Sequence, residues 1–225
     1  MALCELVEVS KSYDTGETIN PVQNLNFAVP EGTMISIQGD SGIGKSTLLM
    51  MMGGLMRPTS GTILFQDKAI GNFTDNQLTE WRGRLVGYLF QNIQLAKALT
   101  IEENIKLAKR FSRNKLKKDN VNTEDILDRL GLKEIKNSLP FQLSGGQKRR
   151  AMIAVTWARN PLLILADEPT NDLDDFWSEQ VMDLFHQWTT SGKSVVLTTH
   201  HNRWADKADR KFKMENKTLV EHKNI

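Results

Sequence analysis

The stretch from Gly39 to Ser46, Gly-Asp-Ser-Gly-Ile-Gly-Lys-Ser, constrains the fold of this chain more than any other feature. It matches the phosphate-binding loop pattern, in which spaced glycines are followed by Lys and then by Ser or Thr. The strand-forming segment Met34–Gln38 precedes it, and an apolar helical stretch, Leu48–Met56, follows it. A strand that runs through a glycine-rich loop into a helix turns backbone N–H groups and the positive helix end toward a phosphate. We therefore expect a strand–loop–helix unit that binds a nucleotide.

Two side chains of this loop have expected roles of their own. Lys45 should reach the β- and γ-phosphates, and the Ser46 hydroxyl should be a ligand of Mg²⁺. The alternative is a glycine-rich turn that binds nothing, which the flanking strand and helix disfavour. The loop alone leaves kinase, GTPase and ATPase activities open. The expected phosphate-binding residues are Gly39, Asp40, Ser41, Gly42, Ile43, Gly44, Lys45, Ser46 and Thr47.

Strand and helix patterns alternate along much of the chain, which predicts an α/β fold. Leu162–Ala166 is entirely apolar, Ser194–Thr198 has the apolar centre Val-Val-Leu, and a predicted helix lies between them. Buried strands of this kind are typical of a parallel sheet covered on both faces. We predict a core at about 1–90 and 160–225, with a helical subdomain inserted at about 91–159. Further predicted strands are Leu6–Val9, Leu25–Val29, Ile63–Phe65, Lys211–Met214 and Thr218–Val220, and the predicted helices include Asp75–Arg84, Ile101–Arg113, Thr123–Leu130, Gly146–Arg159 and Ser178–Thr189.

The amino-acid composition limits the kinds of molecule that this chain is expected to bind. The 29 basic and 27 acidic residues leave a net charge of +2, which gives no reason to expect nucleic-acid binding. The single cysteine, Cys4, fits a reducing compartment. No apolar run approaches the roughly 18–20 residues needed to cross a bilayer, and no signal peptide is evident. We expect a cytoplasmic protein whose membrane role, if it has one, depends on a partner chain.

A second glycine-containing string, Leu143-Ser-Gly-Gly-Gln147, lies directly before a predicted helix and could form another anion-binding helix terminus. Taken alone, it could equally be a capped helix with a glycine turn. Further on, the apolar strand Leu162–Ala166 ends in Asp167-Glu168-Pro169. With the phosphate-binding loop upstream, these strings in this order resemble an ABC-type ATPase. The resemblance extends from Val9 to about Leu219.

The resemblance implies a P-loop NTPase core of the RecA type, with a parallel sheet, an antiparallel β subdomain and an inserted α-helical subdomain. It implies ATP and Mg²⁺ as cofactors. It also implies a head-to-tail homodimer or pseudo-dimer, in which the signature string of one subunit closes over the ATP held by the other. The residues expected to make that contact are Ser144, Gly145, Gly146 and Gln147.

Several single residues match functional positions of the family. Asp167 and Glu168 stand at the end of a predicted strand, where ligands gather in α/β sheets, and they fit a Mg²⁺-associated carboxylate and the general base. By resemblance, Gln91 contacts Mg²⁺ and water, His200 contacts the γ-phosphate, and Tyr13 stacks on adenine. Each could instead be an ordinary surface, loop or core residue, and the neighbouring His201 is the second candidate for the switch histidine. Asn171–Asp174 matches the loop that couples the two sites of the dimer, but Asp172 departs from the small or amide residue often found there.

The family resemblance predicts an ATP-hydrolysing subunit that powers a separate transmembrane permease from the inner face of the membrane. Residues 82–91, 100–104 and 166–170 look most like the lipoprotein-release and macrolide or antimicrobial-peptide exporter branch. Residues 92–101 are the candidate docking segment for the permease. A cell-division type ATPase and a soluble ATPase of the iron–sulfur-assembly type are the alternatives. Intact Lys45, Glu168 and His200 argue against a catalytically silent subunit. The basic stretch Lys106–Lys118 is interpreted as a solvated helical face, with contact to anionic lipids as its alternative.

Overall fold

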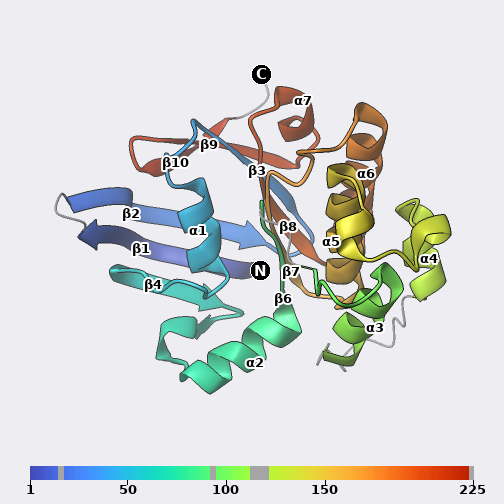
Figure 1. The fold of residues 1–225 in the computed structure, drawn as a ribbon. Coiled ribbons are helices and arrows are strands. Elements are labelled where there is room, and N and C mark those ends of the chain that lie inside the picture. The colour runs from blue at the N-terminus through green and yellow to red at the C-terminus, as the bar shows by residue number, and fades with distance from the viewer. Residues whose placement is uncertain (15–17, 92–94, 112–121, 223–225) are drawn as a thin grey trace.

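The computed structural model describes residues 1–14, 18–91, 95–111 and 122–222, arranged as two β-sheets and a set of helices (Figure 1). A six-stranded sheet runs in the order β10-β9-β3-β8-β7-β6. Neighbouring strands from β9 to β6 are parallel, and β10 pairs antiparallel at the edge. The bounds are Met34–Gln38 (β3), Val86–Leu89 (β6), Leu163–Asp167 (β7), Ser194–Thr198 (β8), Arg210–Glu215 (β9) and Thr218–His222 (β10).

The second sheet is antiparallel, with the order β2-β1-β4-β5. Its strands are Ala2–Asp14 (β1), Thr18–Pro30 (β2), Ser60–Phe65 (β4) and Lys68–Ala69 (β5). The predicted strands Leu6–Val9 and Leu25–Val29 are therefore only the apolar centres of β1 and β2. Register shifts between the paired strands interrupt the alternation of buried and exposed residues, so the pattern predicts shorter strands than are present.

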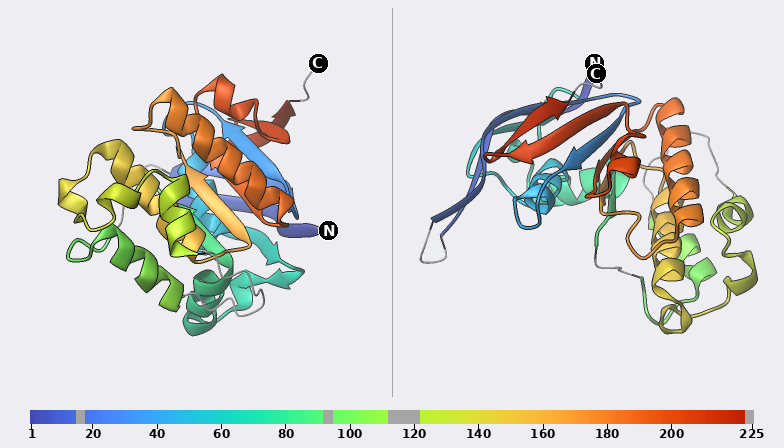
Figure 2. Two further views of the ribbon diagram at one scale, coloured as in Figure 1. Left: turned by 90° about the vertical axis from the view of Figure 1, so that its right-hand side faces the viewer. Right: turned by 90° about the horizontal axis from the view of Figure 1, so that it is seen from above.

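Helix α1 (Lys45–Met52) lies between the two sheets, and its buried side chains join one hydrophobic cluster with residues of both. Figure 2 shows this arrangement from two further directions. The apolar stretch was predicted to remain helical to Met56, which is wrong. Gly53 caps the helix, and Gly54 follows with a φ of 66°, a left-handed conformation that an α-helix cannot continue through.

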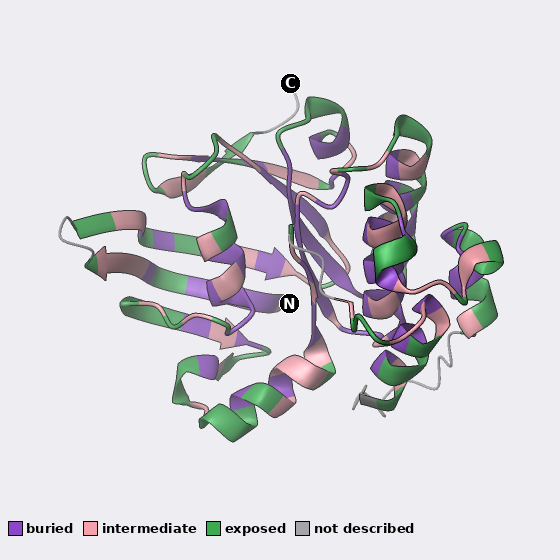
Figure 3. Ribbon diagram, in the orientation of Figure 1, coloured by how far each residue is buried: buried purple, intermediate pink, exposed green. Residues whose placement is uncertain are grey.

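The other face of the central sheet is covered by helices α5 (Gly145–Ala158) and α6 (Asp175–Thr190), beside α3 (Ile101–Phe111) and α4 (Thr123–Arg129). Alternate residues of one strand enter different clusters: Ile35 packs with the α1 side and Met34 with the α5–α6 side. Figure 3 shows the central strands buried along their length. The remaining helices are α2 (Asp75–Leu85), α7 (Asn202–Ala205) and the 3₁₀ turns η1 (Ile70–Asn72), η2 (Lys133–Ile135) and η3 (Pro140–Gln142).

The structure confirms the predicted α/β class with its parallel sheet, antiparallel sheet and helices. No helix within the described ranges is both long enough and apolar enough to span a bilayer. Three of the sequence predictions extend beyond those ranges. The basic stretch Lys106–Lys118 and the predicted helix Ile101–Arg113 run into residues 112–121, and the first three residues of the expected docking segment, 92–94, also lie outside the description.

Candidate nucleotide site

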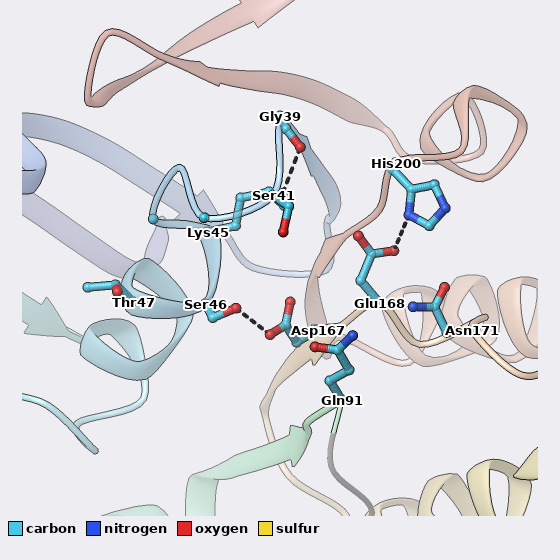
Figure 4. Close-up of a pocket in the computed structure, with 12 residues that line it drawn as sticks. Gly39, Ser41, Lys45, Ser46, Thr47, Gln91, Asp167, Glu168, Asn171 and His200 are labelled. Carbon is cyan, nitrogen blue, oxygen red and sulfur yellow. Dashed lines mark hydrogen bonds and ion pairs between the residues drawn. The ribbon is translucent and has the colours of Figure 1, made fainter.

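The phosphate-binding loop connects the end of β3 to the start of α1 and bends back on itself through glycines. Gly44, the N-cap of α1, has a φ of 118°. A Cβ placed there would lie 2.8 Å from the Pro21 carbonyl oxygen, so both the backbone angle and the contact require glycine. Lys45 is buried, and its Nζ donates to the carbonyl oxygens of Gly39 at 2.7 Å and Asp40 at 2.9 Å (Figure 4). The ammonium is thus held inside the curve of the loop.

A carboxylate at the end of β7 joins this loop to the central sheet. The Ser46 hydroxyl donates to Asp167 Oδ2 at 2.6 Å, and the Thr198 hydroxyl at the end of β8 donates to Asp167 Oδ1 at 2.6 Å. Figure 4 shows the Gln91 side chain, just after β6, beside Asp167. A hydroxyl, a carboxylate and an amide oxygen are the hard donors that Mg²⁺ takes. Ser46, Asp167 and Gln91 therefore fit the metal that the family resemblance implies.

Glu168 and His200 form a second polar pair at the same sheet edge. His200 Nδ1 is hydrogen-bonded to Glu168 Oε2 at 3.1 Å. The backbone N–H of Glu168 bonds to both the carbonyl and the hydroxyl of Thr198, at 3.2 and 3.1 Å, although its φ of 50° is a left-handed value that is uncommon outside glycine. The Glu168 side chain is 12% exposed and that of His200 is 56% exposed. A carboxylate held by its backbone and by an imidazole is suited to orienting and deprotonating a water molecule.

These groups line one pocket. Its residues come from the phosphate-binding loop and from the ends of β6, β7 and β8, as expected for the carboxyl edge of an α/β sheet. His200 lines the pocket. The His201 ring lies against the His200 ring, with 3.9 Å between centroids and a 40° angle between planes, and is not among the lining residues. Asp40 and Ile43 belong to the loop but are absent from the lining. The lining residues are Gly39, Ser41, Gly42, Gly44, Lys45, Ser46, Thr47, Gln91, Asp167, Glu168, Asn171 and His200.

Tyr13, expected to stack on adenine, lies on β1 beside the pocket and not in its wall. Its hydroxyl donates to the Met56 sulfur at 2.9 Å and lies 3.4 Å from the Thr47 hydroxyl. Thr47 does line the pocket, so the ring stands next to the start of α1. This position agrees with a place for the base beyond the phosphates, and adenine stacking stays a prediction.

The signature residues are not brought to this pocket. Ser144 is the N-cap of α5: its hydroxyl accepts from the Gln147 N–H at 3.2 Å, and the Gln147 side chain accepts from the Ser144 N–H at 2.9 Å. They border a separate hollow. Its lining residues are Ser144, Gly145, Gly146, Gln147, Arg150, Asp172, Leu173, Asp174 and Trp177. Within one chain, the two expected phosphate-contacting elements therefore lie in different places.

Two residues near the site carried no signal in the sequence. Thr198 was predicted only as part of a buried strand, yet its hydroxyl and carbonyl support both Asp167 and Glu168. Arg149 is 1% exposed and donates to the Phe90 and Gln91 carbonyls. An arginine in a helix normally faces solvent, so only the three-dimensional structure could find this contact.

Comparison with known proteins identifies the family of this chain. A sequence profile described as ABC transporter matches residues 22–171. An ABC transporter ATP-binding protein of Thermotoga maritima, itself uncharacterised, is 38% identical over 90% of this chain and 87% of its own length. The lipoprotein-releasing system ATP-binding protein LolD of Cytophaga hutchinsonii is 33% identical over 96% of this chain and 99% of its own length. LolD 2 of Chlorobium chlorochromatii is 35% identical over 100% of this chain and 96% of its own length.

Among solved structures, the ATP-binding cassette MJ0796 in a dimeric post-hydrolysis state with ADP and Pi is similar, with a TM-score of 0.89 and 34% identity over 98% of both chains. A further dimeric structure of MJ0796, described as an ABC transporter cassette, matches equally well. The predicted family is confirmed, and the relatives include lipoprotein-releasing ATP-binding proteins of the predicted branch. On its motifs, its fold and these relatives, the chain belongs to the ABC transporter family as an ATP-binding subunit.

Proposed function

We propose that this chain hydrolyses ATP as one half of a head-to-tail dimer and thereby drives a separate membrane-embedded permease. One observation carries the proposal: the pocket that holds the hydrolytic groups and the hollow beside Ser144 are two separate places on one chain. Each offers N–H groups at a helix start, which suits a phosphate. A single nucleotide has no use for two separate phosphate contacts, whereas two chains facing each other in opposite directions would each complete the other's site.

The proposed chemistry assigns one task to each group in the pocket. Lys45 exchanges the Gly39 and Asp40 carbonyls for β- and γ-phosphate oxygens. Mg²⁺, when bound, would be held by Ser46, Asp167 and Gln91 and would neutralise phosphate charge. Glu168 orients a water molecule and accepts its proton as the oxygen attacks the γ-phosphorus, so that the bond to ADP breaks. His200 keeps the Glu168 carboxylate in place and contacts the γ-phosphate.

The partner is proposed to be a permease of the lipoprotein-release or exporter branch, which would hold this chain at the cytoplasmic face of the membrane. The resemblance to two LolD proteins supports the branch. A surface hollow lined by Leu95, Lys97, Pro140, Phe141 and Lys148 lies at the described part of the expected docking segment, and Phe141 is 75% exposed. With Leu95 and Pro140 in the same lining, Phe141 gives the hollow a contiguous apolar part, which fits a protein contact.

The test of the dimer is a Glu168→Gln variant, which keeps the shape of the side chain and removes the base. It should bind ATP, lose turnover by at least about 100-fold, and migrate as a dimer only with ATP in light-scattering chromatography. Lys45→Ala should remain monomeric under the same conditions because its phosphate contact is gone. Unchanged turnover would remove Glu168 from the role of base, and an ATP-bound monomer would contradict the dimer. Co-purification with a soluble complex in place of a membrane protein would contradict the permease.

A further inference from the structure

Arg149 lies in the first turns of α5, two residues beyond the signature string, and its side chain is only 1% exposed. Its Nη1 donates to the Phe90 carbonyl at 2.7 Å, and its Nη2 donates to the Gln91 carbonyl at 3.1 Å. Both acceptors belong to the segment after β6 that carries the Gln91 side chain into the nucleotide pocket. The guanidinium therefore holds the backbone of a residue that is proposed to contact Mg²⁺.

The counter-charge comes from the loop after β7. Asp172 Oδ2 lies 3.7 Å from Arg149 Nη2, and Asp172 has a left-handed φ of 67°. The same residue touches the start of the signature helix. A Cβ added to Gly145 would lie 3.4 Å from the Asp172 Cβ, and one added to Gly146 would lie 2.7 Å from the Asp172 carbonyl oxygen. Asp172 thus lies against Gly145 through its side chain, against Gly146 through its backbone carbonyl, and against Arg149 through its carboxylate.

The charge of the buried Arg149 makes its contact with Asp172 important for where the guanidinium lies. Burial lowers the pKa of Arg149, and the charges of Asp172 and then Asp167 oppose that shift. A buried cation is costly unless opposite charge and hydrogen-bond acceptors compensate it. Among the described residues, no hydrogen-bond acceptor lies against Arg149 Nε, so the two carbonyls and the Asp172 carboxylate provide the compensation. The Arg149 guanidinium therefore connects the Asp172 carboxylate directly to the Gln91 backbone carbonyl.

We propose that Arg149 is a positioning residue for Gln91, and that its pairing with Asp172 makes the Gln91 position depend on the loop 171–174 and on the signature glycines. Asp172 is the residue at which this chain departs from the small or amide residue often found in its family. The proposal rests on the dimer described above, in which the signature of each chain meets the nucleotide of its partner. Docking of that nucleotide against Gly145 and Gly146 then shifts Asp172 and, through Arg149, sets Gln91 for hydrolysis.

Three variants test the link. Arg149→Met keeps a long apolar side chain and removes every donor, and Asp172→Asn removes only the charge. Arg159→Met is the matched control, because Arg159 also donates from a partly buried position to two carbonyls, those of Arg82 and Gly83, at 3.2 Å each. Arg149→Met should lower kcat about tenfold with KM for ATP within about twofold, Asp172→Asn should lower kcat less, and Arg159→Met should leave both near the unmodified values.

The decisive comparison is made in a Gln91→Ala background. If Arg149 acts through Gln91, adding Arg149→Met to the Gln91→Ala variant should lower kcat further by less than about twofold. A further loss as large as that of Arg149→Met alone would overturn the proposal. Hydrogen exchange of the peptide spanning residues 86–91 provides a readout that needs no turnover. Arg149→Met and Asp172→Asn should raise exchange there in the presence of Mg²⁺ and ATP, and Arg159→Met should not. Unchanged hydrogen exchange in Arg149→Met and Asp172→Asn would refute the positioning role, whether or not the chain hydrolyses ATP. A chain that did not hydrolyse ATP at all would count against the proposed function alone.

Discussion

The Ser46 hydroxyl and the Asp167 carboxylate lie 2.6 Å apart, although 121 residues separate them in the chain. The contact joins the first turn of α1 to the end of β7, and Thr198 on β8 holds the other carboxylate oxygen. Parallel strands place their carboxyl ends at one edge, and for this reason three distant segments meet there. The nucleotide pocket is therefore a product of strand order, and hydrogen bonds between distant segments hold its polar groups together.

Replacing Asp167 with Asn should weaken the binding of Mg²⁺-ATP about 10–100-fold, because the amide removes the charge while filling the same space. Affinity for ATP in excess EDTA should change by less than about twofold, since the loop and Lys45 contact the phosphates without the metal. Titration calorimetry under the two conditions measures the difference. The control is Asp183→Asn on α6, whose carboxylate pairs with Lys207 away from the pocket. Equal losses with and without Mg²⁺ would contradict the metal role.

Variants of the neighbouring residues His200 and His201 test which of the two histidines acts in hydrolysis. His200→Ala should lower kcat about 100-fold, because it removes the ring that contacts the Glu168 carboxylate. His201→Ala should change kcat by less than about threefold, since its ring lies against that of His200 but does not line the pocket. ATP affinity should stay similar in both, as measured by fluorescent-nucleotide binding. A larger loss for His201 would reverse the assignment of the switch histidine.

Gly44→Ala should abolish ATP binding. The φ of 118° disfavours any side chain by about 1–3 kcal/mol, and the new Cβ would approach the Pro21 carbonyl oxygen to 2.8 Å. The loop would have to open, which moves its N–H groups away from the phosphates. Gly71→Ala is the control, because a Cβ there has nothing within 4 Å. Nucleotide affinity and melting temperature should be measured together, so that retained affinity in a folded Gly44→Ala chain would refute the argument.

Local sequence patterns could predict most of this pocket because its residues stand within a few positions of strand ends or in the glycine loop. The apolar run before Asp167 predicts both a strand and the place of its carboxylate. Arg149 lies beyond such patterns, since the Phe90 and Gln91 carbonyls it contacts are 59 and 58 residues away. The left-handed φ of Glu168 was equally hidden, because the hydrogen bonds to Thr198 that accompany it are tertiary. Helix α1 ended before its apolar pattern did because Gly53 and Gly54 override the periodicity.

Cys4 gives a prediction for alkaline pH. Burial, reinforced by the Glu5 charge, raises the pKa of Cys4 from 9.0 to about 12. The unfolded chain therefore releases this proton at lower pH than the folded chain, so the free energy of unfolding should fall as the pH rises from 9 towards 12. Urea titrations at pH 8 and pH 10 should show a smaller decrease for Cys4→Ala than for the unmodified chain. Equal decreases would mean that Cys4 does not contribute.

A comparison of variants at Ser144 and Thr74 distinguishes a role in helix capping from a role in contacting the ligand. Each begins a helix with the same reciprocal pair of bonds, Ser144 with Gln147 and Thr74 with Gln77, at 2.8–3.3 Å. Replacing either with Ala should lower the free energy of unfolding by a similar amount, about 1 kcal/mol. Only Ser144→Ala should also weaken the ATP-dependent dimer, which is best measured in the Glu168→Gln background by sedimentation at several protein concentrations. The Thr74 variant should dimerise as the parent does, because α2 lies away from the signature hollow. If both variants dimerise equally, Ser144 serves only as a cap, and the nucleotide of the partner must be held by other residues.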